Sequence, residues 1–257
     1  MNFAAIDVSI LGPAFIAGLL VTLTHVPFGK RVLARGIIFL DLAVAQFAGL
    51  GIIVAHNFHW QPGGWQVQVI ALVSAITGVL ILHFTEKRWP EIQEALIGTM
   101  FVLASSGGIL LLATNPQGGE QLKELLVGQI LWVSYEQLIP VAVLYALILG
   151  VWFGIKNKSS LLFYVLFALA ITASVQLVGV YLVFATLILP ALAIRKYKGG
   201  GLMVGYTIGL TAYLIGLILA ALLDLPAGAL IVYTLAITAY LGSYLNNIKS
   251  GMFRVKK

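Results

Sequence analysis

The sequence contains no cysteine and very little charge. Only 9% of its 257 residues are Asp, Glu, Lys or Arg, whereas soluble domains carry about 25%. Without cysteine, disulfides and thiolate metal sites are both excluded. The Gly-x-x-x-x-Gly-Lys-[Ser/Thr] motif of nucleotide-binding loops is absent, and no Ser-His-Asp arrangement can be argued. The chain is therefore not predicted to be an enzyme, and any ATP hydrolysis would belong to a separate chain.

Apolar residues make up 61% of the sequence and come in blocks of the length that crosses a bilayer, about 20 residues each. The sixth and seventh blocks are nearly continuous, and Gln176 and Gly179 mark the expected break between them. The pattern predicts an all-α, polytopic transmembrane helical bundle of eight or nine spans, forming a single domain over residues 1–257. The blocks cover residues 8–26, 37–55, 66–84, 95–113, 137–155, 161–178, 180–194, 202–223 and 228–245.

The basic residues give the expected orientation. With nine crossings, 14 of the 15 fall on one side of the membrane and only Lys123 falls on the other. Because basic loops face the cytoplasm, we expect the N-terminus outside and the C-terminus inside a plasma (inner) membrane. The net charge of +6 lies in short clusters between apolar blocks, so it predicts lipid-bilayer contact and no nucleic-acid partner. The first residues lack a basic region, which favours a retained first span over a signal peptide.

Asp41 is the acidic residue that lies well inside an apolar block. A carboxylate in a span costs about 2.5–3.5 kcal/mol on insertion scales and usually faces a bundle interior or a cavity. We favour a pathway or ligand role, and the alternative is an ion pair with Arg35 or another basic group near the inner face. Gln46 shares the helix, five residues further on, and is more often a helix–helix hydrogen-bonding residue than a ligand.

Two polar segments on the outer side have open interpretations. His56 and His59 are three residues apart, a spacing seen in metal sites. The favoured alternative is an interfacial loop in which Trp60 and Trp65 anchor the chain. In the second segment, residues 114–129, Pro and Gly residues end the preceding helix and a short amphipathic turn follows. It is either a surface helix on the membrane or a lid or docking element over a central pathway.

Three stretches resemble the permease subunits of metal ABC importers of the zinc and manganese type. They cover roughly a third of the chain and occur in the family's order. Residues 36–51 resemble the family's signature helix, and residues 95–134 resemble a span followed by an extracytoplasmic loop and short helix. Residues 176–195 resemble the family's Val-Gly-x-x-Leu-Val-x-x-x-Leu-Ile-x-Pro-Ala segment.

The resemblance implies a ligand set that this sequence holds only in part. Asp41 matches the family's intramembrane acidic ligand, but Ala45 stands where the family has His and Gln46 is displaced by one. The outer loop of close relatives reads Pro-His-Gly-x-Glu-His. Here Gln117 and Gln121 stand at the two His positions and Glu120 is retained. Since imidazole suits zinc better than an amide oxygen does, the sequence favours a metal permease with a weakened zinc site.

The resemblance also implies where an ATPase docks. In this family the segment after the Pro-Ala motif meets the ATP-binding subunit, which corresponds here to Pro190, Arg195, Lys196 and Lys198. The alternative for this segment is a simple positive-inside anchor. The loop over residues 89–94 is a second candidate for the inner face.

The function that these observations predict is the permease subunit of an ATP-driven importer of a divalent metal cation, zinc or manganese, as transported substrate. No tightly bound cofactor is expected. The implied partners are a separate ATP-binding subunit, an extracytoplasmic metal-binding protein and a second copy of the chain in a homodimer. The alternatives are an ATP-independent secondary transporter, for which an inverted repeat would be the signature, and a membrane scaffold subunit without transport.

Overall fold

The computed structural model describes residues 7–58, 60, 64–113, 115–197 and 199–254. These residues form ten α-helices joined by loops and by the short 3-10 turns η2 (Pro90–Ile92) and η3 (Ile130–Trp132), without a strand. The predicted all-α class is therefore confirmed. The helices are α1 (Val8–Arg35), α2 (Leu40–Asn57), α3 (Trp65–Arg88), α4 (Gln93–Leu112), α5 (Gly118–Val127), α6 (Tyr135–Gly154), α7 (Ser160–Val178), α8 (Val180–Ile194), α9 (Gly201–Leu223) and α10 (Ala227–Arg254).

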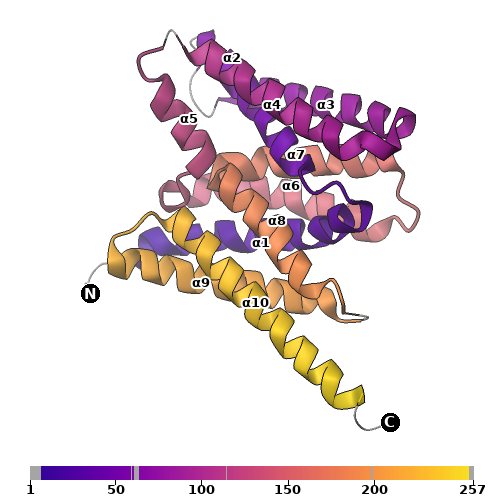
Figure 1. Cartoon of the computed structure of the whole chain (residues 1–257). Coiled ribbons are helices and arrows are strands. Elements are labelled where there is room, and N and C mark those ends of the chain that lie inside the picture. Colours follow the sequence, from indigo (N-terminus) through magenta and orange to yellow (C-terminus); the bar gives the residue numbers. More distant parts are fainter. Residues whose placement is uncertain (1–6, 59, 61–63, 114, 198, 255–257) are drawn as a thin grey trace.

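All helices except α5 run between two ends of the bundle and reverse direction at each connection (Figure 1). The loops after α1, α3, α6 and α8 gather at one end, on the right in the figure, and we call this the basic end. The opposite end carries α5, and we call it the α5 end. The basic end holds Lys30, Arg31, Arg35, Lys87, Arg88, Lys156, Lys158, Arg195 and Lys196.

Nine apolar blocks were expected and each corresponds to one of these helices. Among the described residues, seven helices are long and apolar enough to cross a membrane, and α2 and α8 are shorter apolar helices. Helix α8 has 15 residues, or about 22 Å at 1.5 Å per residue, against a hydrocarbon thickness of about 30 Å. The expected break falls at Gly179, the single residue between α7 and α8, whose φ of 80° favours glycine.

The helices pack as two groups with α7 between them. Helix α2 packs against α3 and α4, and these form the upper group in Figure 1. Helices α1 and α10 both pack against α8 and α9, and these four helices form the second group. Helix α7 contacts α3 and α2 on one side and α1 and α8 on the other. The space between the two groups is therefore bounded by α2, α7 and α8.

Helices α1 and α9 approach closely because small residues stand at their crossing. A Cβ on Gly209 would lie 2.5 Å from Cγ2 of Thr22, and a Cβ on Gly205 would lie 2.7 Å from Val26 Cγ1. Glycines four residues apart form a groove on one face of a helix, which is how helices pack in lipid without a hydrophobic driving force. The Gly205–Gly209 face of α9 thus sets how near α1 can come.

Several helix starts carry their own capping residue. Asp7 Oδ1 accepts the Ser9 N–H at 2.8 Å, and the Ser9 bonds hold the pKa of Asp7 below its usual value. Ser134 and Gln137 form a capping box at the start of α6, and Ser159 Oγ accepts the Leu162 N–H at 3.1 Å. Helix α2 has no side-chain cap of its own. Instead, the Phe39 N–H donates to Oε1 of Glu94, on α4, at 3.2 Å.

Candidate functional site

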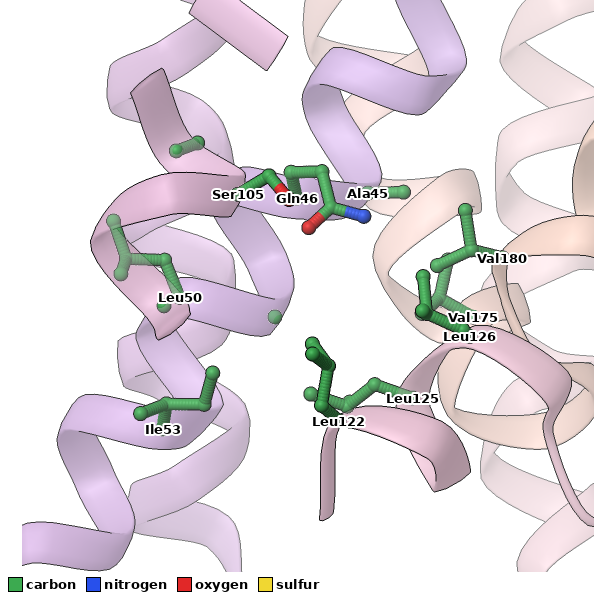
Figure 2. Close-up of a pocket in the computed structure, with 13 residues that line it drawn as sticks. Ala45, Gln46, Leu50, Ile53, Ser105, Leu122, Leu125, Leu126, Val175 and Val180 are labelled. Atoms are coloured by element: carbon green, nitrogen blue, oxygen red, sulfur yellow. The ribbon is translucent and has the colours of Figure 1, made fainter. Parts of the chain in front are cut away.

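A small cavity lies between the two groups of helices, where α2, α4, α5, α7 and α8 meet (Figure 2). Its volume is about 10 Å³, which is room for about one water molecule. The cavity can hold a water molecule or a small ion but excludes an organic substrate in this conformation. Its lining residues are Ala45, Gln46, Gly49, Leu50, Ile53, Ala104, Ser105, Gly108, Leu122, Leu125, Leu126, Val175 and Val180.

Gln46 is the main polar side chain of this cavity. It is 9% exposed, and Figure 2 shows its amide group directed into the open space, with Ser105 of α4 beside it. The remaining walls are apolar or glycine. One amide and one hydroxyl give neutral oxygen ligands, which suit hard cations and bind softer ones weakly.

Helix α5 covers the cavity on the α5 end. Leu122, Leu125 and Leu126 line the cavity from this helix. Lys123 lies on its exposed side, where Nζ is 3.6 Å from Glu120 Oε1. The amphipathic pattern of residues 114–129 therefore places its apolar face inward over the cavity. Of the two expectations for this segment, the lid arrangement agrees with the geometry and a helix lying apart on the membrane surface does not.

The end of α5 is fixed against the break between α7 and α8. Gly128 follows α5 with a φ of 71°, and its backbone lies directly against the backbone of Gly179. A Cβ on Gly179 would lie 2.6 Å from the Gly128 Cα, so neither position has room for a side chain. Because Val175 and Val180 on either side of this break line the cavity, the position of α5 and the shape of the cavity are linked.

The polar residues expected in the outer loop gather at the start of α5, outside the cavity. Gln117 is exposed and precedes the helix. Gln121 Oε1 accepts the Asn115 side-chain amide at 3.3 Å. Glu120 is exposed beside Lys123. All three residues stand at the start of α5, and none of them lines the cavity at Gln46.

Asp41 lies apart from the cavity, in the first turn of α2 at the basic end. It is 1% exposed, and its Oδ1 has no hydrogen-bond partner. The alternative that Asp41 pairs with Arg35 is wrong, because the Arg35 guanidinium Nη1 lies 3.6 Å from Glu86 Oε1.

Arg35 belongs to a polar network that joins three helices at the basic end. Besides its ion pair with Glu86 of α3, its Nη1 donates to Ser160 Oγ of α7 at 3.1 Å. Ser160 Oγ in turn donates to Glu86 Oε2 at 2.6 Å. The guanidinium also lies 4.8 Å from the centre of the Phe163 ring. No local pattern predicts this network, because its members are far apart in the chain and stand at helix ends.

The remaining expected site residues lie at the two ends of the bundle. His56 is in the last turn of α2 at the α5 end, while His59 is outside the described residues. Pro190 is buried within α8, and Arg195 and Lys196 are exposed in the turn that follows it. Lys198 is outside the described residues. The exposed Arg195 and Lys196 leave the basic end of α8 open to a partner.

No group of three or more His, Asp or Glu side chains able to hold a metal ion occurs in the described part of the chain.

Comparisons with known proteins match the chain along most of its length. The model of the "ABC 3 transport family" matches residues 7–159 and 154–246. The high-affinity zinc uptake system membrane protein ZnuB of Haemophilus influenzae is 25% identical over 246 residues, which cover 87% of this chain and 92% of the relative. A Chlamydia trachomatis protein named "Probable metal transport system membrane protein" is 23% identical, with 86% of this chain and 84% of the relative covered.

The fold is also similar to that of a solved structure. PsaBC from Streptococcus pneumoniae in complex with Fab superposes with a TM-score of 0.73 at 20% identity. The match covers 90% of both chains. The overall arrangement of the helices is therefore one that also occurs in a solved structure.

Proposed function

Because the chain belongs to the ABC 3 transport family, we propose that it is the membrane permease of an ATP-driven importer whose cargo is a divalent metal cation, zinc or manganese. It is a transport subunit and not an enzyme. The observation that carries the proposal is the family match, which runs through the whole bundle from residue 7 to residue 246. Relatives that include a zinc uptake protein and a metal transport protein support a metal as cargo.

The geometry of the cavity supports a small ion as cargo. The cavity at Gln46 has room for about one water molecule, and α5 closes it toward the α5 end. Alternating access would open this cover and then the basic end in turn. Gln46 would meet the ion on its way through, and Asp41 would meet it near the basic end.

The two ends of the bundle suit two different partners. We assign the basic end to the cytoplasm, following the positive-inside rule, and the exposed Arg195 and Lys196 to the contact with a separate ATP-binding subunit. The α5 end then faces outward, where an extracytoplasmic metal-binding protein would deliver the cation near Gln117, Glu120 and Gln121. Two copies of the chain would form the transport unit in the inner membrane, with both N-termini outside.

The rival functions predict different behaviour. A secondary transporter would move metal without an ATPase. A scaffold subunit would bind the ATPase without moving metal. ATP-dependent metal uptake, together with co-purification of an ATPase subunit, supports the permease and contradicts both rivals.

The test is metal accumulation in cells that express this chain with its co-encoded neighbours. Zinc, manganese and iron are measured in parallel, for the wild type and for Asp41→Ala. A matched control keeps the permease intact and replaces the nucleotide-binding lysine of the ATPase subunit. Accumulation of one metal that is lost in both variants, with equal amounts of permease in the membrane, is the expected result. If no metal accumulates above the level of cells without this chain, the proposed function is wrong.

A further inference from the structure

Helix α7 is fastened to α3 at both of its ends. At the α5 end the side chains of Gln68 and Gln176 bond to each other twice, and Gln176 Nε2 donates to Gln68 Oε1 at 2.9 Å. At the basic end Ser160 Oγ donates to Glu86 Oε2 at 2.6 Å. The two contacts are 18 residues apart on α3 and 16 residues apart on α7, or about 27 and 24 Å at 1.5 Å per residue. Helix α7 is therefore joined by polar bonds to the upper group, and we call α2, α3, α4 and α7 the α3 unit.

The second group of helices is joined within itself. Gly29 of α1 lies directly against the backbone carbonyl of Leu187 on α8, where a Cβ would have no room. The hydroxyl groups of Thr186 on α8 and Tyr213 on α9 share a hydrogen bond of 2.9 Å. Helix α9 in turn packs closely on α1 through its glycines. Helices α1, α8 and α9 therefore form a second packed unit beside the α3 unit.

The α3 unit and the second group are connected in two places that differ in kind. At the α5 end the chain itself passes from α7 to α8 through the single residue Gly179, which has a φ of 80°. At the basic end Arg35 of α1 contacts both partners in the α3 unit, since its Nη1 donates to Ser160 Oγ at 3.1 Å and lies 3.6 Å from Glu86 Oε1. Within the described part of the chain, Arg35 makes the only side-chain hydrogen bond or ion pair between the second group and the α3 unit.

We propose that Arg35, Glu86 and Ser160 form a latch that holds the basic end of the bundle closed, and that this end opens about Gly179 when Arg35 leaves. A one-residue junction keeps the two parts of the bundle connected at the α5 end, while the polar contact at the other end can break. The inference rests on the proposed import function, in which the basic end has to open toward the cytoplasm to release the cation.

The surroundings of the latch allow it to open and close. Arg35 and Glu86 are 19% and 24% exposed, so water can replace their contact as the helices part, which a deeply buried ion pair would not permit at low cost. His83 offers Glu86 a replacement partner on its own helix, because its Nδ1 lies 3.9 Å from Glu86 Oε2 and has no hydrogen-bond partner. Ser160 Oγ also stays bonded to Glu86. The carboxylate is therefore left with polar neighbours on α3 and α7 when Arg35 departs with α1.

A single introduced cysteine can report on this opening, because the chain contains no cysteine of its own. Phe28, Val32 and Arg35 share one face of α1 by their spacing, and this face meets α7, since the Phe28 ring and the Arg35 guanidinium both lie against Phe163. Val32 is fully buried. The experiment measures how fast a charged maleimide labels Val32→Cys in the assembled transporter, with its ATP-binding subunit, in nanodiscs. Val21→Cys, which is equally buried about three turns away on α1, reports any general loosening of the bundle.

We expect Arg35→Met to raise the labelling rate of Val32→Cys by about fivefold or more and to leave that of Val21→Cys unchanged. Glu86→Gln should change the rate in the same direction. Arg35→Lys keeps the positive charge and should stay closer to the wild type. Arg88→Met is the matched control, because it removes an exposed basic residue at the same end of the bundle, and it should leave both rates unchanged.

Two results would overturn the latch. One is an unchanged labelling rate of Val32→Cys in Arg35→Met and Glu86→Gln. The other is an equal increase at Val32→Cys and Val21→Cys, which would make Arg35 a residue of general stability. Neither result bears on import, which is measured separately as metal accumulation in cells. Wild-type cells that accumulate no metal would overturn the import function itself.

Discussion

Gly128 and Gly179 are in backbone contact, although 51 positions separate them. Both have positive φ values, 71° and 80°, and neither has room for a Cβ. One ends α5, which covers the Gln46 cavity, and the other separates α7 from α8, which line it. The contact therefore fixes the end of α5, which covers the cavity, against the junction between α7 and α8.

Gly179→Ala should displace α5 and lower both stability and transport. The alanine would combine an unfavourable positive φ with a collision against the Gly128 backbone, so a loss of about 1–3 kcal/mol in the free energy of unfolding is expected. Thermal unfolding in detergent and metal uptake in cells are the measurements. Gly119→Ala is the control, because a Cβ there meets nothing within 4 Å. Equal unfolding temperatures for the two variants would contradict the contact.

Gln46→Leu should slow transport while leaving the fold intact. Leucine is close to glutamine in size and suits the apolar walls of the cavity, so the unfolding free energy should change by less than about 1.5 kcal/mol. The loss of the amide oxygen should lower the uptake rate several-fold. Initial rates of metal uptake at matched protein levels check this, with Ser106→Ala, on the exposed side of α4, as the control. A normal rate in Gln46→Leu would remove this cavity from the pathway.

Gly209→Val should push α1 and α9 apart. A Cβ at this position lies 2.5 Å from Thr22 Cγ2, so the added side chain forces a shift that typically costs about 1–3 kcal/mol. The midpoint of unfolding should fall accordingly. Gly150→Val is the matched control, since a Cβ on this mid-helix glycine of α6 meets nothing within 4 Å. A control that is destabilised as much as Gly209→Val would refute the close packing of α1 on α9.

The ion pair between Arg35 and Glu86 should be strongly coupled. Their side chains are 19% and 24% exposed, and Ser160 bonds to both. A double-mutant cycle with Arg35→Met and Glu86→Gln should give a coupling energy of about 1–3 kcal/mol. The exposed pair Glu120 and Lys123, at 66% and 68% exposure, serves for comparison, and its coupling should be close to zero. Coupling energies of the same size in both pairs would speak against a buried network.

The sequence was sufficient for the helices and for the break, since both depend on local patterns. Apolar blocks of bilayer length became α1 to α4 and α6 to α10, and the glycine at position 179 became the junction of α7 and α8. The orientation of the bundle and the single domain are still predictions. Local sequence patterns predict directly only the length and position of each helix.

The site could be predicted only in part, because its members are joined across the chain. Asp41 and Gln46 lie in one apolar block, but five residues on a helix turn their side chains about 140° apart, and Gln46 lines the cavity whereas Asp41 does not. Arg35 was considered as a partner of Asp41, six residues away, whereas its partner is Glu86 on α3. Glu94 stands at the edge of an apolar block in the sequence. Its hydrogen bond with the Phe39 N–H depends on the packing of α4 against α2, which the sequence does not show.

The missing local cap of α2 has a consequence for how the protein is made. Asp7, Ser134 and Ser159 are present when their own helices leave the ribosome. The residue that serves the start of α2 is Glu94, 55 positions later in the chain, and it emerges only after all of α3 has been synthesised. When helix α2, with Asp41 in its first turn, leaves the ribosome, the acceptor for the Phe39 N–H at its start has therefore not yet been synthesised. The hydrogen bond at the start of α2 can therefore form only once α4 has been synthesised.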